Sequence, residues 1–317
     1  MNLIKFIENF PDETACIKKF KEIRDHEGVT CRKCGSKSHY WQQSIMQFQC
    51  KQCGTRTTLR SGTILQASKL PYRYWFITIH LMTSTKKSFS ALELQRQIGH
   101  KYYEPIWFMM QKIRQTMGIR DGKYPINKIV ELDEGFFESV DTDKTSEERK
   151  SEKRKRGRGS QKQSPVMVMA STVHDFTSVK HHKKPTKFRY VRMVVTENLR
   201  GETVDEIIKH NVDYDSVIKT DKYTSYANIK ENVWTHLPEK PATKDTEKAL
   251  PWVHTMISNA KRSLLGIHHM VSKKYIQNYL NEFCYKVNRR NYGEKLFDRL
   301  LIACVSYQYR NIVNVYR

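Results

Sequence analysis

Two pairs of cysteines near the N-terminus have the spacing of a metal site. Cys31 and Cys34 are separated by two residues, and after 15 further residues Cys50 and Cys53 repeat that spacing. Cysteines paired in this way on two tight turns form the tetrahedral thiolate cage that zinc prefers, and four protein ligands leave no open position for catalysis. The spacing therefore predicts a structural zinc ion. Basic residues around the pairs would give this knuckle a phosphate-binding surface: Arg32, Lys33, Lys51, Arg56 and Arg60.

Two aspartates lie within or at the end of apolar segments that are typical of β-strands. Asp133 lies within residues 129–137, and Asp221 ends residues 216–221. Two carboxylates that converge from rigid strands can hold Mg²⁺, which keeps several waters and bridges to substrate phosphates. An aspartate at a strand end is also a common turn former. The pair alone therefore leaves both interpretations open.

A third polar element lies in residues 252–270. Its polar side chains fall at helical spacing beside apolar ones: His254, Ser258, Asn259, Lys261 and Arg262. Such a helix could add ligands to the aspartates, and a solvated helix face is the alternative. Glu134 points to the opposite face of its strand from Asp133, because strand side chains alternate, so a shared metal ion is not expected.

The charge balance indicates a polyanionic partner. The chain has 56 Lys and Arg against 33 Asp and Glu, a net charge of +23, which favours nucleic acid. Residues 144–164 carry nine basic residues and no apolar one, so we expect a mobile basic loop there. An odd number of cysteines, no apolar run long enough for a membrane and no secretory signal pattern lead us to expect a cytoplasmic protein.

The elements that must position these residues change along the chain. Residues 1–27 form a helical lead-in, residues 28–62 the zinc ribbon, and residues 63–120 a helical region in which Gly99 makes the turn of an expected helix-turn-helix. An ordinary helical hairpin that touches no DNA is the alternative. From residue 121 to residue 317 we expect a mixed α/β domain with a basic insertion at 139–164. Its strands cover four segments: 129–137, 166–173, 188–195 and 216–221.

The order of these landmarks resembles bacterial insertion-sequence transposases. The shared features are the basic zinc ribbon, the helix-turn-helix, the strand with ELDE, TDKYTSY at the end of a later strand, HTMISNAKRSLLGIHH and YLNEFCYKVNRR. The resemblance runs from about Cys31 to Arg290 and is to the zinc-ribbon group with a ribonuclease-H-like catalytic domain. It implies a catalytic set of Asp133, Asp221, Asn259 and Lys261, with Asn259 where the wider superfamily usually has Glu.

The resemblance implies a function for the whole chain. The protein would bind the terminal inverted repeats of its own element in double-stranded DNA, cleave a phosphodiester bond with the help of two Mg²⁺ ions, and join the freed end to target DNA. Both ends must be held together, so we expect a homodimer or larger assembly on DNA, associated with the nucleoid. A catalytically inactive DNA-binding regulator and a nuclease that cuts without joining are the alternatives.

Overall fold

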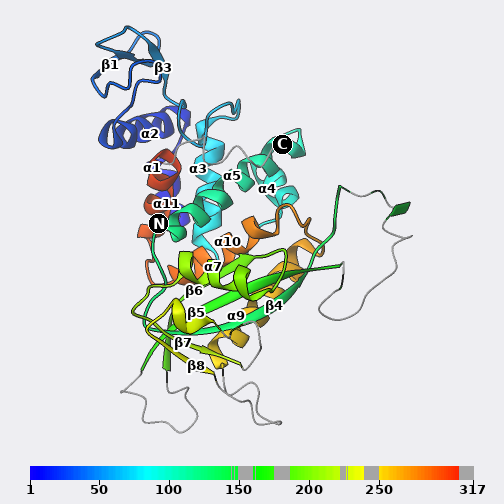
Figure 1. Cartoon of the computed structure of the whole chain (residues 1–317). Helices are drawn as coiled ribbons and strands as arrows, with labels where there is room; N and C mark the ends of the chain where they lie inside the picture. The colour runs from blue at the N-terminus through cyan, green and yellow to red at the C-terminus, as the bar shows by residue number, and fades with distance from the viewer. Residues whose placement is uncertain are drawn as a thin grey trace. The chain divides into compact units, whose positions relative to one another are not determined.

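The computed structural model divides the chain into two compact units. Unit 1 contains Met1–Met117 and Asn291–Arg317, and unit 2 contains Gly118–Arg290 (Figure 1). The structure describes residues 1–143, 145, 147–148, 160, 162–174, 186–221, 226, 228–238 and 250–306. Most of the predicted basic loop at 144–164 lies outside these residues. Among the described helices, none combines the length and the apolar character that crossing a membrane requires.

The N-terminal part of unit 1 begins with two helices and a small sheet. Asn2 and Asp12 accept hydrogen bonds from the first turns of the two helices, which separates the lead-in into two pieces. The zinc ribbon follows as an antiparallel sheet in the order β1-β2-β3. The elements are α1 (Leu3–Asn9), α2 (Glu13–Glu27), β1 (His39–Gln42), β2 (Gln47–Cys50) and β3 (Arg56–Thr58).

Four further helices belong to the helical part of the chain around this ribbon: α3 (Tyr72–Ser84), α4 (Ala91–Ile98), α5 (Tyr103–Gly122) and α11 (Lys295–Ser306). Gly99 ends α4 in the left-handed conformation at φ 74°, and α5 begins a few residues later. This helical pair occupies the segment expected for the helix-turn-helix. The last residues of α5, from Gly118, belong to unit 2.

Helix α11 lies in unit 1, although we assigned all of residues 121–317 to the catalytic domain from the sequence. The reason is an aromatic cluster that joins α11 to the N-terminal helices. The Phe297 ring lies 5.7 Å from the ring of Phe6 and 5.6 Å from that of Phe10, and Phe76 of α3 lies 5.0 Å from Phe10. All four side chains are buried, so the C-terminal helix completes the core of unit 1.

Unit 2 is built on one five-stranded sheet in the order β6-β5-β4-β7-β8. Strands β4, β5 and β6 are antiparallel neighbours, whereas β7 pairs in parallel with β4 and β8 in parallel with β7. The sheet is mixed and belongs to a unit that also contains helices, so the predicted mixed α/β class is confirmed. The strands are β4 (Ile129–Glu138), β5 (Gln163–His174), β6 (Thr186–Val195), β7 (Val217–Thr220) and β8 (Thr235–Pro238).

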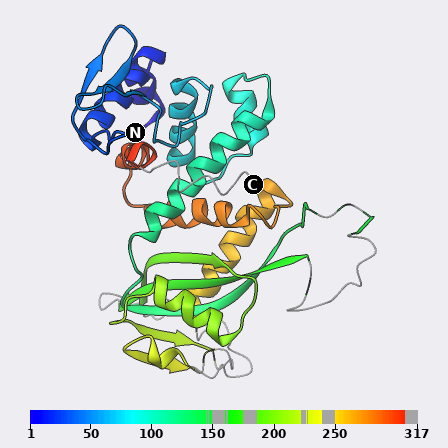
Figure 2. The same cartoon turned by 45° about the horizontal axis from the view of Figure 1, so that its top comes forward.

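Helices cover both faces of this sheet (Figure 2). Val130 and Leu132 of β4 join the core under α7, whereas Phe137 joins the core under α9 and α10. The strand alternates in this way because successive side chains point to opposite faces, so Glu131 and Asp133 lie on the α9 face. The helical elements are α7 (Gly201–Asn211), η3 (Ile229–Glu231), α9 (Pro251–His268) and α10 (Ile276–Asn288).

Candidate active site and zinc ribbon

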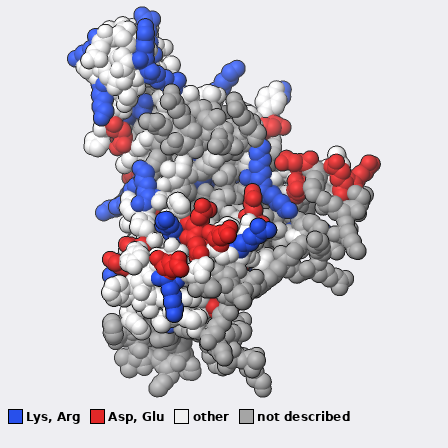
Figure 3. Space-filling view, in the orientation of Figure 1, with Lys and Arg blue, Asp and Glu red and all other residues white. Residues whose placement is uncertain are grey.

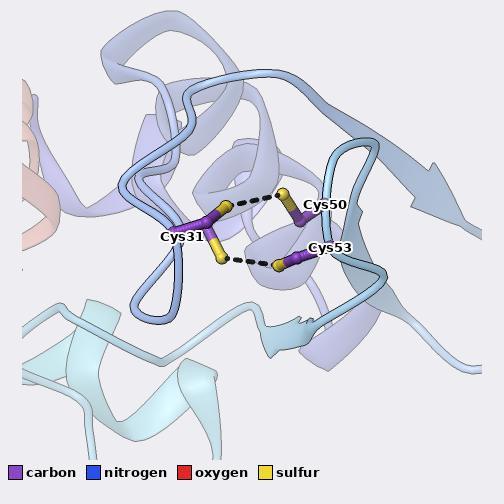
Figure 4. A group of neighbouring side chains, drawn as sticks. Cys31, Cys50 and Cys53 are labelled. Carbon is purple, nitrogen blue, oxygen red and sulfur yellow. Dashed lines mark hydrogen bonds between the residues drawn. The ribbon is translucent and has the colours of Figure 1, made fainter.

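The four cysteines of the ribbon form one cluster. Their sulfur atoms all lie within 4.8 Å of one another, with Cys31 Sγ 3.5 Å from Cys53 Sγ and Cys34 Sγ 3.5 Å from Cys50 Sγ (Figure 4). Among the described residues, no other group of three or more His, Cys, Asp or Glu side chains is gathered in this way. Four thiols at this spacing fit the tetrahedral geometry of structural zinc, as the sequence predicted.

The two cysteine turns have the same local structure. The backbone N–H of Gly35 donates to Cys31 and that of Gly54 donates to Cys50, and both glycines have positive φ, at 73° and 69°. A hydrogen bond between the Cys53 sulfur and the Thr55 hydroxyl lowers the pKa of Cys53 to about 6, helped by the Thr55 backbone. This direction favours the thiolate, which is the form that binds zinc.

The surface of the ribbon is basic (Figure 3). No acidic residue occurs between Glu27 and Glu93, while Lys33, Lys51 and Arg56 are exposed. Two of the predicted phosphate contacts are occupied within unit 1. The guanidinium of Arg60 donates to the Ser68 carbonyl and stacks on Tyr72, and Arg32 donates to the Gln66 side chain. The basic face available for phosphate is accordingly smaller than the sequence indicated.

The two candidate aspartates belong to a pair of neighbouring parallel strands, Asp133 within β4 and Asp221 directly after β7. Strands β4 and β7 pair Ile129 with Val217 and Glu131 with Lys219. Asp133 lies two residues after Glu131 in β4, and Asp221 directly follows the end of β7. Asp133 lies on the face of the sheet that α9 covers, and Asp221 directly follows the strand that neighbours β4.

Helix α9 runs along β4 in the same direction, and successive contacts fix this alignment. Near the start of the helix, Glu131 Oε2 accepts the backbone N–H groups of Trp252 at 2.7 Å and Val253 at 3.0 Å. Further along, a Cβ added to Gly135 would lie 2.8 Å from the Phe137 ring of the same strand and 3.4 Å from the side chain of Ile257. A glycine at this position therefore makes room chiefly for the Phe137 ring, while Ile257 keeps the helix in contact with the strand.

Glu131 is a functional candidate that the sequence analysis missed. It is 3% exposed and lies on the same face of β4 as Asp133, two residues away. No side chain of α9 or its N-cap residue Leu250 caps the first turn, so the carboxylate of Glu131 takes that role from the sheet. The sequence did contain a signal for Glu131, because an acidic residue two positions before Asp133 in an apolar strand must lie on the same face as Asp133.

The two flanks of α9 face different neighbours. The His254 Nδ1 atom lies 3.4 Å from Asp133 Oδ2, and Lys261 Nζ lies 5.7 Å from the centre of the Phe137 ring in β4. On the other flank, the Trp252 indole donates to the Thr186 hydroxyl of β6 at 2.9 Å. At 3.6 residues per turn, His254 and Lys261 lie about 20° apart around the helix, so both belong to the flank that faces β4.

Asn259 lies on the flank away from the aspartates. It is five residues after His254, which places it about 140° around the helix from that residue and about 20° from Trp252. Its side chain is exposed. The structure therefore brings His254 to Asp133 and leaves Asn259, the third catalytic residue by resemblance, on the Trp252 side. Its catalytic assignment stays a prediction.

Glu134 lies on the opposite face of β4, as expected from strand alternation. There it is next to Tyr226, which is 1% exposed and belongs to the core under α7. Burial raises the pKa of the Tyr226 phenol well above its usual value, and the charges of Glu134, Asp133 and Asp221 raise it further. The Tyr226 phenol thus stays protonated on the face of the sheet opposite to Asp133.

Comparisons with known proteins match both parts of the chain. Residues 125–288 match the family described as the ISXO2-like transposase domain, and residues 11–56 match the transposase zinc-ribbon domain. A protein described as "Uncharacterized protein in transposable element ISH50" from Halobacterium salinarum is 24% identical over 290 residues, which cover 87% of this chain and 91% of that protein. Among solved structures, a Mos1 transposase paired-end complex with the left transposon end is 12% identical, with 77% and 82% of the two chains covered and a TM-score of 0.28.

Proposed function

Because the chain belongs to the family of ISXO2-like transposases, it is a DNA transposase, and we propose that it cleaves the ends of its own element in a metal-dependent reaction and joins them to target DNA. The observation that supports this proposal is that Asp133 lies within β4 and that Asp221 directly follows β7, the parallel neighbour of β4. Two carboxylates on one face can bind a divalent cation beside a phosphate.

Different residues of unit 2 would have different roles around the scissile phosphate. Asp133 and Asp221 would hold the Mg²⁺ ions, which supply charge neutralisation when bound. Lys261, on the flank of α9 that faces β4, would orient the phosphate or stabilise the leaving oxygen. Glu131 positions the helix. The resemblance gives the third ligand as Asn259.

Unit 1 would supply recognition of the element ends. The exposed basic side chains of the ribbon suit phosphate contacts, which position a protein on DNA without reading its sequence. The α4–α5 pair suits insertion of a helix into the major groove, where bases can be read. Because two element ends must be held for joining, we also propose a dimer or larger assembly on DNA.

A direct assay tests this function. The purified full-length protein is mixed with a labelled duplex that carries an inverted repeat from the DNA flanking its coding frame, together with a supercoiled target plasmid and Mg²⁺ or Mn²⁺. We expect nicks that leave a 3′-hydroxyl at the repeat end, followed by labelled plasmid. Specific binding of the repeat without any cleavage in either metal would contradict the proposal.

A further inference from the structure

We propose that His254 is the residue of α9 that binds a catalytic metal ion together with Asp133, in the role that the resemblance assigns to Asn259. This inference rests on the proposed metal-dependent function of the same site. Its basis is the position of the imidazole, which approaches the Asp133 carboxylate from the helix that covers it.

The orientation of α9 over the sheet is fixed independently of His254. Glu131 holds the backbone of the first turn, and the buried stripe of Val253, Met256, Ile257 and Ala260 packs into the core. With this stripe facing the sheet, each remaining side chain has a defined flank. The flank that faces Asp133 is therefore set by the core of unit 2 and by Glu131.

His254 and Lys261 share this flank because seven residues make almost two full helical turns. One helix face then offers a metal ligand near Asp133 and a cation one step further along β4, beside Phe137. For Asn259 to face Asp133, the helix would have to rotate by about 140°. That rotation would move the apolar stripe out of the core and break both hydrogen bonds to Glu131.

The distance between His254 and Asp133 suits a shared ion. Two adjacent ligands of an octahedral ion with bonds of about 2.1 Å lie about 3.0 Å apart. The His254 Nδ1 and Asp133 Oδ2 atoms are 3.4 Å apart, and the two side chains are 36% and 15% exposed, which leaves room for waters and a phosphate oxygen. Asp221 directly follows β7, the parallel neighbour of β4, so we expect its carboxylate to add a ligand or hold a second ion.

An imidazole ligand changes the preference for the metal. A neutral imidazole adds no charge to the site. The two aspartates and the DNA phosphates must therefore neutralise the positive charge of the metal ion. Nitrogen ligands suit transition metals, whereas Mg²⁺ is bound mainly by oxygen. The site should therefore bind Mn²⁺ more tightly than Mg²⁺, and replacing His254 with aspartate should reverse that preference.

Pulsed electron paramagnetic resonance of the Mn²⁺-loaded, zinc-replete full-length protein tests this inference directly. We expect one class of bound Mn²⁺ that Asp133→Asn removes and that shows the ¹⁴N coupling of a coordinated imidazole. His254→Gln should abolish the coupling and weaken Mn²⁺ binding by roughly tenfold or more, the scale of losing a group at a metal site. His254→Asp should keep the ion without the coupling, and Asn259→Ala should keep both.

Two outcomes would overturn the assignment. An Asp133-dependent Mn²⁺ signal without ¹⁴N coupling in the wild-type protein would make His254 a hydrogen-bonding neighbour only and would leave the proposed function intact. A coupling that persists in His254→Gln would assign the nitrogen to another residue. By contrast, Mn²⁺ binding that Asp133→Asn leaves unchanged would remove the metal site on which both proposals rest.

Discussion

The carboxylate of Glu131 lies 2.7 Å from the backbone nitrogen of Trp252 and thereby attaches the first turn of α9 to strand β4. The same strand carries Asp133 two residues later, and the same helix carries His254 two residues after Trp252. One buried hydrogen-bonded group therefore sets the distance between the strand and the helix that face each other across the candidate metal site.

Removing this attachment should slow the reaction more than it weakens DNA binding. Glu131→Ala leaves two helix N–H groups without their acceptor, which should cost about 1–3 kcal/mol of stability. A shift of about 1 Å in α9 can lower the cleavage rate about a hundredfold. Glu131→Gln keeps an acceptor oxygen and should retain more activity. Glu138 is exposed at the end of the same strand and provides the control. Glu138→Ala should change neither the stability nor the cleavage rate.

The aspartates should be required for chemistry and not for recognition. Asp133→Asn and Asp221→Asn keep the size of each side chain and remove a charged ligand, so end cleavage should fall below detection while end binding in a gel-shift assay stays within about twofold. Asp215 is an exposed aspartate just before β7, and Asp215→Asn should cleave normally. Normal strand transfer by Asp221→Asn would contradict the mechanism.

Loss of zinc should affect unit 1 alone. Cys31→Ser or Cys50→Ser removes one of four ligands, and the protein should then hold less than about one zinc ion per chain and lose end-specific binding. Hydrogen exchange should increase in β1–β3 and stay unchanged in the sheet of unit 2. Cys284 is buried in α10 of unit 2, and Cys284→Ala should keep the zinc. Full zinc content in Cys31→Ser would refute the site.

The helical part of unit 1 should become less stable in mild acid. His80 of α3 is 2% exposed and stacks on Phe6 with ring centres 4.4 Å apart, and burial lowers its pKa. Its folded pKa lies below the unfolded value of about 6.5, so the stabilisation is complete above that pH and is lost as the pH falls. The loss is at most about 1.4 kcal/mol per pH unit.

Hydrogen exchange of the α3 amides between pH 5 and 8, corrected for the intrinsic rate, measures this effect. His80→Phe keeps an aromatic ring and should remove the dependence. His26, with a side chain that is 87% exposed, provides the control, and His26→Gln should leave the dependence unchanged. An unchanged dependence in His80→Phe would assign the effect to another group.

The segment at 144–164 should contribute to nonspecific DNA binding. Residues 150–158 contain six Lys and Arg. Replacing these six with Gln at constant length should reduce the slope of log affinity against log salt by about 0.9 for each phosphate that is no longer neutralised. Arg192 of β6 instead donates to the Asn211 side chain at 2.9 Å, so we expect it to make no bond to phosphate. A slope that the six substitutions do not alter would exclude a contribution from the segment.

Most elements could be predicted because their signals are local. Segments rich in β-forming residues identified β4, β5, β6 and β7, and the paired cysteines identified the ribbon within a short stretch of chain. Strand β8 was missed, since it has four residues of which Leu237 is exposed and the last is a proline. Helix α11 was assigned to the wrong unit because Phe297 meets Phe6 and Phe10 across almost the whole sequence, and no local pattern indicates such an interaction.

The site was predictable in part for the same reason. The strand pattern alone placed Asp133 within one strand and Asp221 at the end of another. The apolar stripe of α9 already implies that His254 and Asn259 lie on different flanks, but only the order of the strands tells which flank faces Asp133. A motif transferred by position alone therefore could not distinguish these two residues.

The position of α11 has a consequence for how the chain is made. The ribosome releases the N-terminal helices first, yet the aromatic partner that completes their core, Phe297, emerges only after the whole of unit 2 has been synthesised. A chain that terminates early would contain every strand of the catalytic sheet and still lack a finished first unit. Unit 1 therefore completes its fold last. During synthesis, the catalytic sheet of unit 2 would form before unit 1, the unit that we propose recognises DNA.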